Sequence, residues 1–201
     1  MKKISLFFYI GILIFFTGCT INTNMNNNNT KKLEKKITFI NYNAGYSFGN
    51  TQNAKIVIVE YSSYECEDCR NLHKNIGNLL KKHIDNGDIL YIYKSVNHPK
   101  FLNDEKINEY FAPKSLDDIE NIFNRFDSYS RKDYKTVKSV LNLKEKTVSN
   151  YESMNKTISN EINVGKITGT PTIYINGIKY TKVFARQEFQ KILDSYIVPN
   201  S

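Results

Sequence analysis

Two short apolar runs flank an amphipathic segment in the first half of the folded part of the chain. Residues 55–60 read KIVIVE, which is typical of a buried strand, and residues 89–94 form a second such run. From Cys66 to about His83, apolar side chains recur at helical spacing and predict one apolar stripe. This order favours two parallel strands joined by a crossover helix. Residues 36–40 are predicted to form a short edge strand before them.

The second half of the chain is predicted to be helical and polar before it returns to strands. Residues 101–163 read as helices, with breaks expected at residues 111–113 and 126–129. A core strand is expected at residues 170–175, and the Asn176–Gly177 pair that follows is a strong hairpin signal. The last expected elements are a return strand and a closing amphipathic helix, at residues 178–181 and 188–197.

The beginning of the chain has the pattern of an export signal. Residues 1–19 read MKKISLFFYIGILIFFTGC, with two lysines, an apolar stretch and a small residue before Cys19. The apolar stretch is too short to span a bilayer comfortably, since a spanning helix needs about 20 apolar residues. The ending resembles a bacterial lipoprotein signal, which implies removal of residues 1–18 and lipid attachment at Cys19. The alternative is an uncleaved anchor, or a signal that is cleaved elsewhere. The lipoprotein interpretation and this alternative both place the domain outside the cytoplasm, where disulfides persist.

Composition bounds the rest of the molecule. Residues 19–35 hold few large apolar side chains and are predicted to be a flexible tether, which leaves residues 36–198 for the folded domain. The chain has 201 residues, 40% of them apolar, which suffices for one domain with an insertion. Its net charge is +8, but the lysines are scattered and form no arginine-rich stripe. A basic surface near anionic lipid is therefore favoured over nucleic-acid binding.

Cys66 and Cys69 form a C-x-x-C pair that follows a strand and opens a helix. Since a helix N-terminus stabilises negative charge, Cys66 is expected to be the acidic, reacting thiol and Cys69 the one that resolves a mixed disulfide. A structural disulfide would close too short a loop to stabilise the fold much, and a four-cysteine zinc site lacks its second pair. His73 lies on a similar helix face, so a copper site with the two cysteines, or simple helix packing, are alternatives for it.

Several segments resemble the disulfide-bond protein A branch of the thioredoxin superfamily. They are GNTQNA at 49–54, VEYSSYEC at 59–66, CRNLH at 69–73 and GTPT at 169–172. The resemblance covers about residues 46–98 and 165–181. It implies an α/β thioredoxin fold with halves at about 54–96 and 165–198, and an inserted helical subdomain at about 101–163.

The resemblance also implies roles for single residues. Pro171 should be cis and face the cysteines, and Thr170 should offer its backbone to a substrate chain. Glu60 matches a buried acid that moves protons between water and the second cysteine. Lys94 on the following strand is a candidate partner for it, because a buried acid without a partner is costly. The alternative is that Glu60 is exposed at a strand end.

The implied activity is disulfide exchange with exported cysteine-containing proteins, as a dithiol oxidase or isomerase, with no cofactor and no metal. Electrons would pass to a quinone-linked membrane oxidant or from a membrane reductant, because the chain has no second redox pair. Glu67 and Asp68 stand where strongly oxidising relatives often carry Pro-His, and negative neighbours raise a thiol pKa, so we expect a milder oxidant. A reductant of the cytochrome-maturation type, a copper-handling protein and a non-catalytic adhesin are the alternatives.

Overall fold

The structure is a computed structural model that describes residues 37–144 and 148–197. The predicted signal, the tether and Cys19 lie outside these residues, so the predictions about them stay predictions. Within the described ranges, no helix is both long enough and apolar enough to cross a membrane.

A five-stranded sheet lies at the centre of the fold, in the order β1-β3-β2-β4-β5. The strands are β1 (Tyr46–Gly49), β2 (Ile56–Ser62), β3 (Ile89–Ser95), β4 (Thr172–Ile175) and β5 (Ile178–Tyr180). Strands β2 and β3 are parallel, as predicted, and the other neighbouring pairs are antiparallel. Asn176 and Gly177 join β4 to β5 with φ of 44° and 83°, as a type I′ turn requires.

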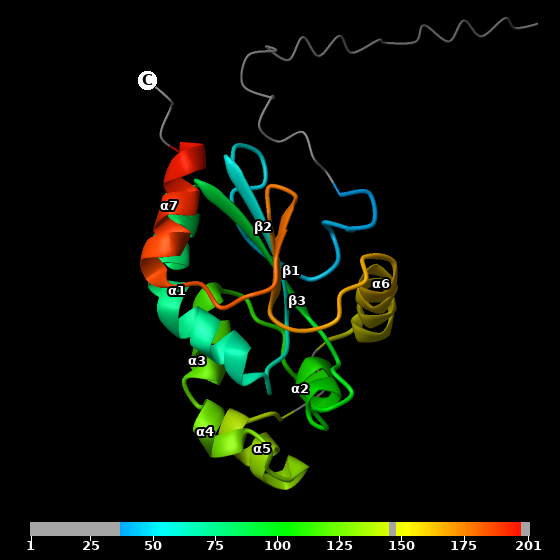
Figure 1. The fold of residues 1–201 in the computed structure, drawn as a ribbon. Helices are drawn as coiled ribbons and strands as arrows, with labels where there is room; N and C mark the ends of the chain where they lie inside the picture. The colour runs from blue at the N-terminus through cyan, green and yellow to red at the C-terminus, as the bar shows by residue number, and fades with distance from the viewer. Residues whose placement is uncertain (1–36, 145–147, 198–201) are drawn as a thin grey trace, which may run out of the picture.

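Helices cover both faces of this sheet (Figure 1). They are α1 (Glu67–Asp85), α2 (Asp104–Tyr110), α3 (Leu116–Phe123), α4 (Phe126–Tyr129), α5 (Tyr134–Leu141), α6 (Tyr151–Val164) and α7 (Arg186–Ile197). Helices α1 and α7 pack on one face and α6 on the other, α3 packs against α1, and α2, α4 and α5 lie toward one end of the sheet (Figure 1). The predicted α/β fold with a helical insertion is therefore confirmed.

The two faces of the sheet have separate cores because side chains alternate along each strand. Ile56 and Ile58 of β2 pack with Leu72 of α1 in the larger cluster. Val59 and Tyr61 of the same strand belong to a second cluster, on the side of α6. Which face a residue of β2 or β3 occupies is thus decided by its place in this alternation.

Two local predictions are wrong. Residues 37–40 form a turn, closed by the Ile40 N–H donating to the Ile37 carbonyl at 3.1 Å, and the edge strand is β1 instead. Residues 126–129, expected as a break, form helix α4, because Phe126 and Tyr129 are buried and anchor this single turn in the larger core.

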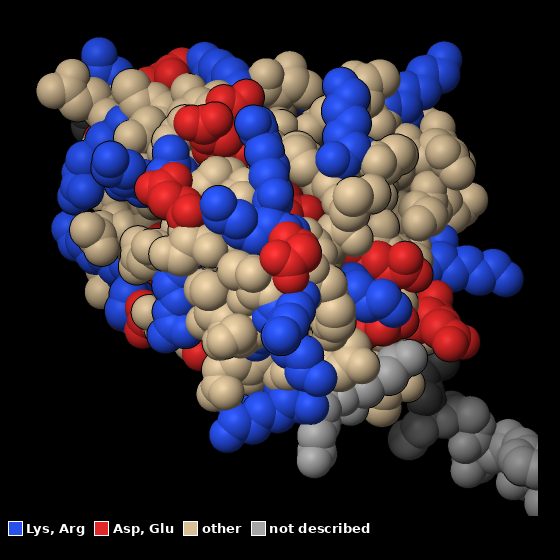
Figure 2. Space-filling model, turned by 90° about the horizontal axis from the view of Figure 1, so that it is seen from below, with Lys and Arg blue, Asp and Glu red and all other residues tan. Residues whose placement is uncertain are grey.

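Charged side chains are mixed on the face of the molecule shown in Figure 2. This view looks onto the end of the molecule that holds the helical insertion, and Lys and Arg are interspersed there with Asp, Glu and neutral surface. Such a mixture is typical of an ordinary solvated surface.

Candidate active site

Cys66 and Cys69 occupy the first turn of α1, as the C-x-x-C pattern predicted. Cys66 is the N-cap residue, with extended backbone at φ −88° and ψ 118°, and Cys69 follows inside the helix. Both are free thiols. Cys66 keeps 7% of its surface exposed, whereas Cys69 is completely buried. Only Cys66 is therefore open to a protein substrate.

The pKa values of the two thiols are shifted in opposite directions. A hydrogen bond from Cys69 lowers the pKa of Cys66 to about 6 against the effect of burial, helped by the Thr170 side chain and by the backbone N–H groups of Cys69 and Asp68. Burial raises the pKa of Cys69 well above its usual range, and the neighbouring Cys66 and Glu60 raise it further. At neutral pH the pair therefore consists of a Cys66 thiolate and a Cys69 thiol.

Thr170 and Pro171 lie beside the first cysteine. Their peptide bond is cis, as predicted. In its protonated form, Cys66 donates to the carbonyl oxygen of Thr170, with 3.3 Å between Sγ and oxygen. Pro171 is buried, while Thr170 is half-buried and Gly169 exposed, so the edge of this loop is open beside the sulfur. Substrate binding by Thr170 and Pro171 stays a prediction.

Glu60 and Lys94 are not partners, so the predicted pairing is wrong. In the parallel register of β2 and β3, Glu60 lies opposite Tyr93, and Tyr61 lies opposite Lys94. Paired neighbours share a face, and successive residues alternate. Glu60 consequently faces α1, while Lys94 faces α6. Glu60 is nonetheless buried, with 1% of its surface exposed, so the alternative of an exposed strand-end residue is also excluded.

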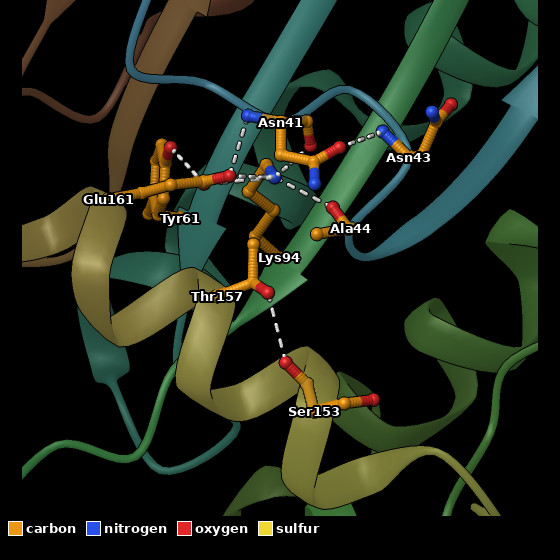
Figure 3. Close-up of polar contacts among 8 residues, drawn as sticks. All are labelled: Asn41, Asn43, Ala44, Tyr61, Lys94, Ser153, Thr157 and Glu161. Carbon is orange, nitrogen blue, oxygen red and sulfur yellow. Dashed lines mark hydrogen bonds and ion pairs between the residues drawn. The ribbon is translucent and has the colours of Figure 1, made fainter.

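Lys94 forms a buried ion pair with Glu161 of α6, far along the chain (Figure 3). Its Nζ lies 2.9 Å from Glu161 Oε2 and donates to the carbonyls of Asn41 at 2.8 Å and Ala44 at 2.7 Å. Tyr61 donates to the same carboxylate at 2.6 Å. Lys94 therefore fastens the segment before β1 and helix α6 to the sheet, on the face opposite to the cysteines.

His73 is the actual partner of Glu60. Its Nε2 lies 3.2 Å from Glu60 Oε1, and its Nδ1 lies 2.8 Å from Glu120 Oε1 of α3. Tyr91 donates to the other oxygen of Glu60 at 2.8 Å. Burial opposes a charge on His73, but the two carboxylates outweigh it and raise the pKa of His73 to about 10. Burial likewise opposes a charge on Glu60, but His73, Tyr91 and Ser62 outweigh it and lower the pKa of Glu60. The buried pair is therefore imidazolium and carboxylate.

The thioredoxin family model matches residues 43–195. The chain belongs to the thioredoxin family. Solved structures share this fold along most of the chain. A conserved protein of unknown function from Enterococcus faecalis V583 has a TM-score of 0.68 at 19% identity, covering 78% of this chain and 93% of its own.

Two further solved structures have the same fold. Wolbachia pipientis α-DsbA1 has a TM-score of 0.62 at 21% identity, covering 78% of this chain and 92% of its own. Oxidised BdbD from Bacillus subtilis has a TM-score of 0.57 at 19% identity, covering 78% and 94%. A search of curated protein sequences gives no match. At these identities the likeness establishes the fold.

The two acids between the cysteines do not prevent the low pKa of Cys66. Glu67 and Asp68 are exposed. Glu67 lies 3.5 Å from the Arg70 guanidinium, which also lies 3.1 Å from Asp127. Exposed charges act through water and are weak, and here a cation stands beside them. Their expected upward effect on the pKa of Cys66 is outweighed by the hydrogen bonds to the sulfur.

The helical insertion holds the loop that leads into the motif, a role that the sequence did not reveal. Glu65 is buried and accepts from the backbone N–H groups of Asn103 at 3.0 Å and Arg131 at 3.1 Å. Tyr129 donates to the carbonyl oxygen of Tyr64 at 2.6 Å. These contacts join residues about 40 to 65 positions apart, and no local pattern marks them. The insertion thereby fixes the backbone just before Cys66.

The copper alternative finds little support in this arrangement. Both ring nitrogens of His73 face carboxylates, which leaves neither directed at the cysteines. Over the described part of the chain, no three His, Cys, Asp or Glu side chains are grouped in a way that could hold a metal ion. The geometry of His73 indicates ion pairing.

Proposed function

We propose that this chain is an exported thiol–disulfide oxidoreductase that works through Cys66 and Cys69. One observation carries the proposal: an acidic, partly open Cys66 caps a helix in contact with a fully buried Cys69. A thiolate is the reacting form of cysteine, and the buried thiol can be reached only from its neighbour. The thioredoxin fold and the names of α-DsbA1 and BdbD support the same activity.

In the oxidising direction, a substrate thiolate attacks Sγ of Cys66 in the Cys66–Cys69 disulfide. The Cys69 sulfur leaves with the electron pair and takes up a proton. A second substrate thiolate then attacks the mixed disulfide and forms the substrate disulfide, releasing Cys66 as a thiolate. The substrate loses two electrons and the protein gains them. The low pKa of Cys66 helps this second step, since a thiol of lower pKa leaves faster.

The direction that we propose is oxidation or isomerisation. Stabilising the Cys66 thiolate stabilises the reduced protein and makes the disulfide more oxidising. The pKa of about 6 lies between the roughly 7 of thioredoxin and the roughly 3.5 of DsbA. A mild oxidant is therefore expected. The alternative function, a reductant of the cytochrome-maturation type, would use the same residues and would differ from the oxidant only in its reduction potential and its partner.

Partners and location follow from the sequence predictions. We propose that a lipid on Cys19 anchors the chain to a bacterial membrane, with the domain on the extracytoplasmic side. Exported cysteine-containing proteins are the substrates, and a membrane redox partner renews the disulfide or the dithiol. Thr170 and Pro171 would hold the substrate strand beside Cys66. Glu60 would take up and return the proton of Cys69.

The test is transfer of one disulfide to a defined substrate. The purified full chain, oxidised, is mixed with an equal amount of a reduced peptide that contains two cysteines, and alkylation with mass detection counts the remaining thiols. The wild type should leave the peptide oxidised and Cys66 and Cys69 reduced. Cys66→Ser should transfer nothing. A wild type that leaves the peptide reduced, and that also fails to reduce the oxidised peptide, would end the proposal.

A further inference from the structure

Three charged side chains in contact with one another form a line that leads from the core between the sheet and α1 to the surface of the molecule. Glu60 of β2 contacts His73 of α1 at 3.2 Å, and His73 contacts Glu120 of α3 at 2.8 Å. The side chains of Glu60 and His73 are 1% exposed, whereas 23% of the Glu120 side chain is exposed. The Glu60 end of the line is therefore shielded from solvent, and the Glu120 end is accessible to it.

The outer end opens into a polar pocket between α1 and α3. Its volume is about 410 Å³, and its lining includes His73, Glu120, Lys74, Lys81 and Asp117. Lys81 and Asp117 pair with each other at 3.1 Å across the pocket. Water and small solutes can therefore reach the Glu120 carboxylate.

Gly77 makes the contact between His73 and Glu120 possible. A Cβ atom at this position would lie 2.4 Å from Glu120 Oε1, far inside contact distance. Gly77 stands four residues after His73 and so lies on the same face of α1. A glycine inside a helix costs about 1 kcal/mol relative to alanine. The helix thus carries a costly residue at the place where Glu120 must approach.

The inner end of the line and the buried cysteine share one face of the sheet, because Glu60 faces α1 and Cys69 packs in the core cluster on that face. The charge of Glu60 is close enough to raise the pKa of Cys69. Ser62, two residues after Glu60 on the same face of β2, is completely buried and lies close enough to lower the pKa of both Glu60 and Cys69. Within the described residues its hydroxyl has no partner at hydrogen-bond distance.

We propose that Glu60, His73 and Glu120 couple the proton of Cys69 to water through the pocket between α1 and α3. The inference rests on the proposed function. When Cys69 forms the disulfide, its proton moves to Glu60 as the carboxylate becomes a carboxylic acid. His73 then releases its Nδ1 proton to Glu120, which passes it to water, and keeps its Nε2 proton toward Glu60. One proton enters the line and another leaves it.

Reduction of the disulfide reverses these moves. Glu120 takes a proton from water and returns it to Nδ1 of His73, while Glu60 gives its proton to the departing Cys69 thiolate. The histidine ring need not rotate in either direction, and the buried charges stay balanced in both redox states. His73 and Glu120 act through Glu60, so they are positioning residues, and neither touches the reacting sulfurs.

Two tyrosines also face this line of charged side chains, and their protonation state does not change in the proposed steps. Tyr91 of β3 donates to Glu60, and Tyr93 presents its ring to His73 with 6.1 Å between the ring centres. Burial raises the pKa of both phenols well above the usual range, so they stay neutral at physiological pH.

The first test follows the charge of His73 by nitrogen NMR of the full chain at pH 7. We expect an imidazolium in the reduced protein and a neutral ring protonated on Nε2 in the oxidised protein. The same protonation state in both forms would overturn the inference, while disulfide exchange itself could remain intact. Failure of the proposed function gives a different result: in the transfer test, the two-cysteine peptide would then be neither oxidised nor reduced by the chain.

The second test follows the rate at which dithiothreitol reduces the oxidised full chain in weak buffer. Glu120→Gln should slow reduction at least about tenfold, and added acetate should restore part of the rate through the pocket. Gly77→Ala should act similarly because it displaces Glu120 while keeping its charge. Asp117→Asn is the matched control, since it removes an equal charge from the same pocket, and should leave the rate unchanged. Equal rates for Glu120→Gln and Asp117→Asn would contradict the inference.

Discussion

Cys66 Sγ lies 3.3 Å from the carbonyl oxygen of Thr170, so the reactive sulfur and the backbone that precedes Pro171 share one surface. Cys69 lies behind this surface without any exposed area. A substrate can therefore approach Cys66 along the Thr170 backbone, but it cannot reach Cys69.

Cys69→Ala should trap substrates on Cys66. Without the second thiol, the mixed disulfide between Cys66 and a substrate cannot be resolved from within the chain. Non-reducing gels should show covalent complexes of the variant with reduced, unfolded substrate proteins after mild oxidation. The double variant Cys66→Ser, Cys69→Ala should give none. Complexes in that double variant would show that another group, and not Cys66, forms the adducts.

The reduced protein should react with iodoacetamide at Cys66 with an apparent pKa of about 6. The rate should rise as pH increases through 6 and then level off, because the thiolate is the nucleophile. The depressed pKa stabilises the reduced fold fully above the pKa of an unfolded cysteine, about 8.5, and this stabilisation is lost as pH falls through about 6. A rate that still rises with pH above 8 would contradict the assignment.

Lys94→Met should destabilise the fold by about 3–5 kcal/mol, because it leaves the buried Glu161 carboxylate without its cation. Adding Glu161→Gln should recover much of the loss, since the uncompensated charge disappears. Urea unfolding measures both variants. Lys81→Met, in an exposed pair with Asp117, is the control and should leave the free energy of unfolding nearly unchanged. Equal losses for the two lysines would refute the structural role of Lys94.

Tyr129→Phe should weaken the hold of the insertion on the loop before Cys66. The variant leaves the carbonyl of Tyr64 without its 2.6 Å hydrogen bond in a buried place, at a cost of about 1–3 kcal/mol. We expect lower stability in urea and slower exchange with the two-cysteine peptide. An unchanged exchange rate together with lower stability would mean that the insertion supports the fold and does not position the motif.

Local patterns predicted the parts of the molecule that depend on neighbours in sequence. The strand at β2, the helix that Cys66 opens, and the Asn176–Gly177 turn follow from periodicity and turn chemistry, and the structure has all three. The cis bond at Pro171 followed from a family resemblance. These features need no knowledge of which distant segments meet.

Pairing across the sheet could not be predicted in the same way. Glu60 and Lys94 looked like partners because they lie on adjacent strands, but the register of β2 and β3 puts them on opposite faces. Their real partners, His73 and Glu161, come from helices packed on those faces. Strand register and helix packing are long-range outcomes, and Gly77 in α1 was an unused signal of a close approach.

The reduction potential of the Cys66–Cys69 pair tests the central claim most directly. The full chain is equilibrated in glutathione buffers of graded ratio, quenched with acid and alkylated, and the fraction of Cys66–Cys69 disulfide is measured by mass, with Cys66→Ser as the control. The account predicts a reversible two-electron transition between the roughly −120 mV of DsbA and the roughly −270 mV of thioredoxin. No disulfide between Cys66 and Cys69 at any ratio would contradict it.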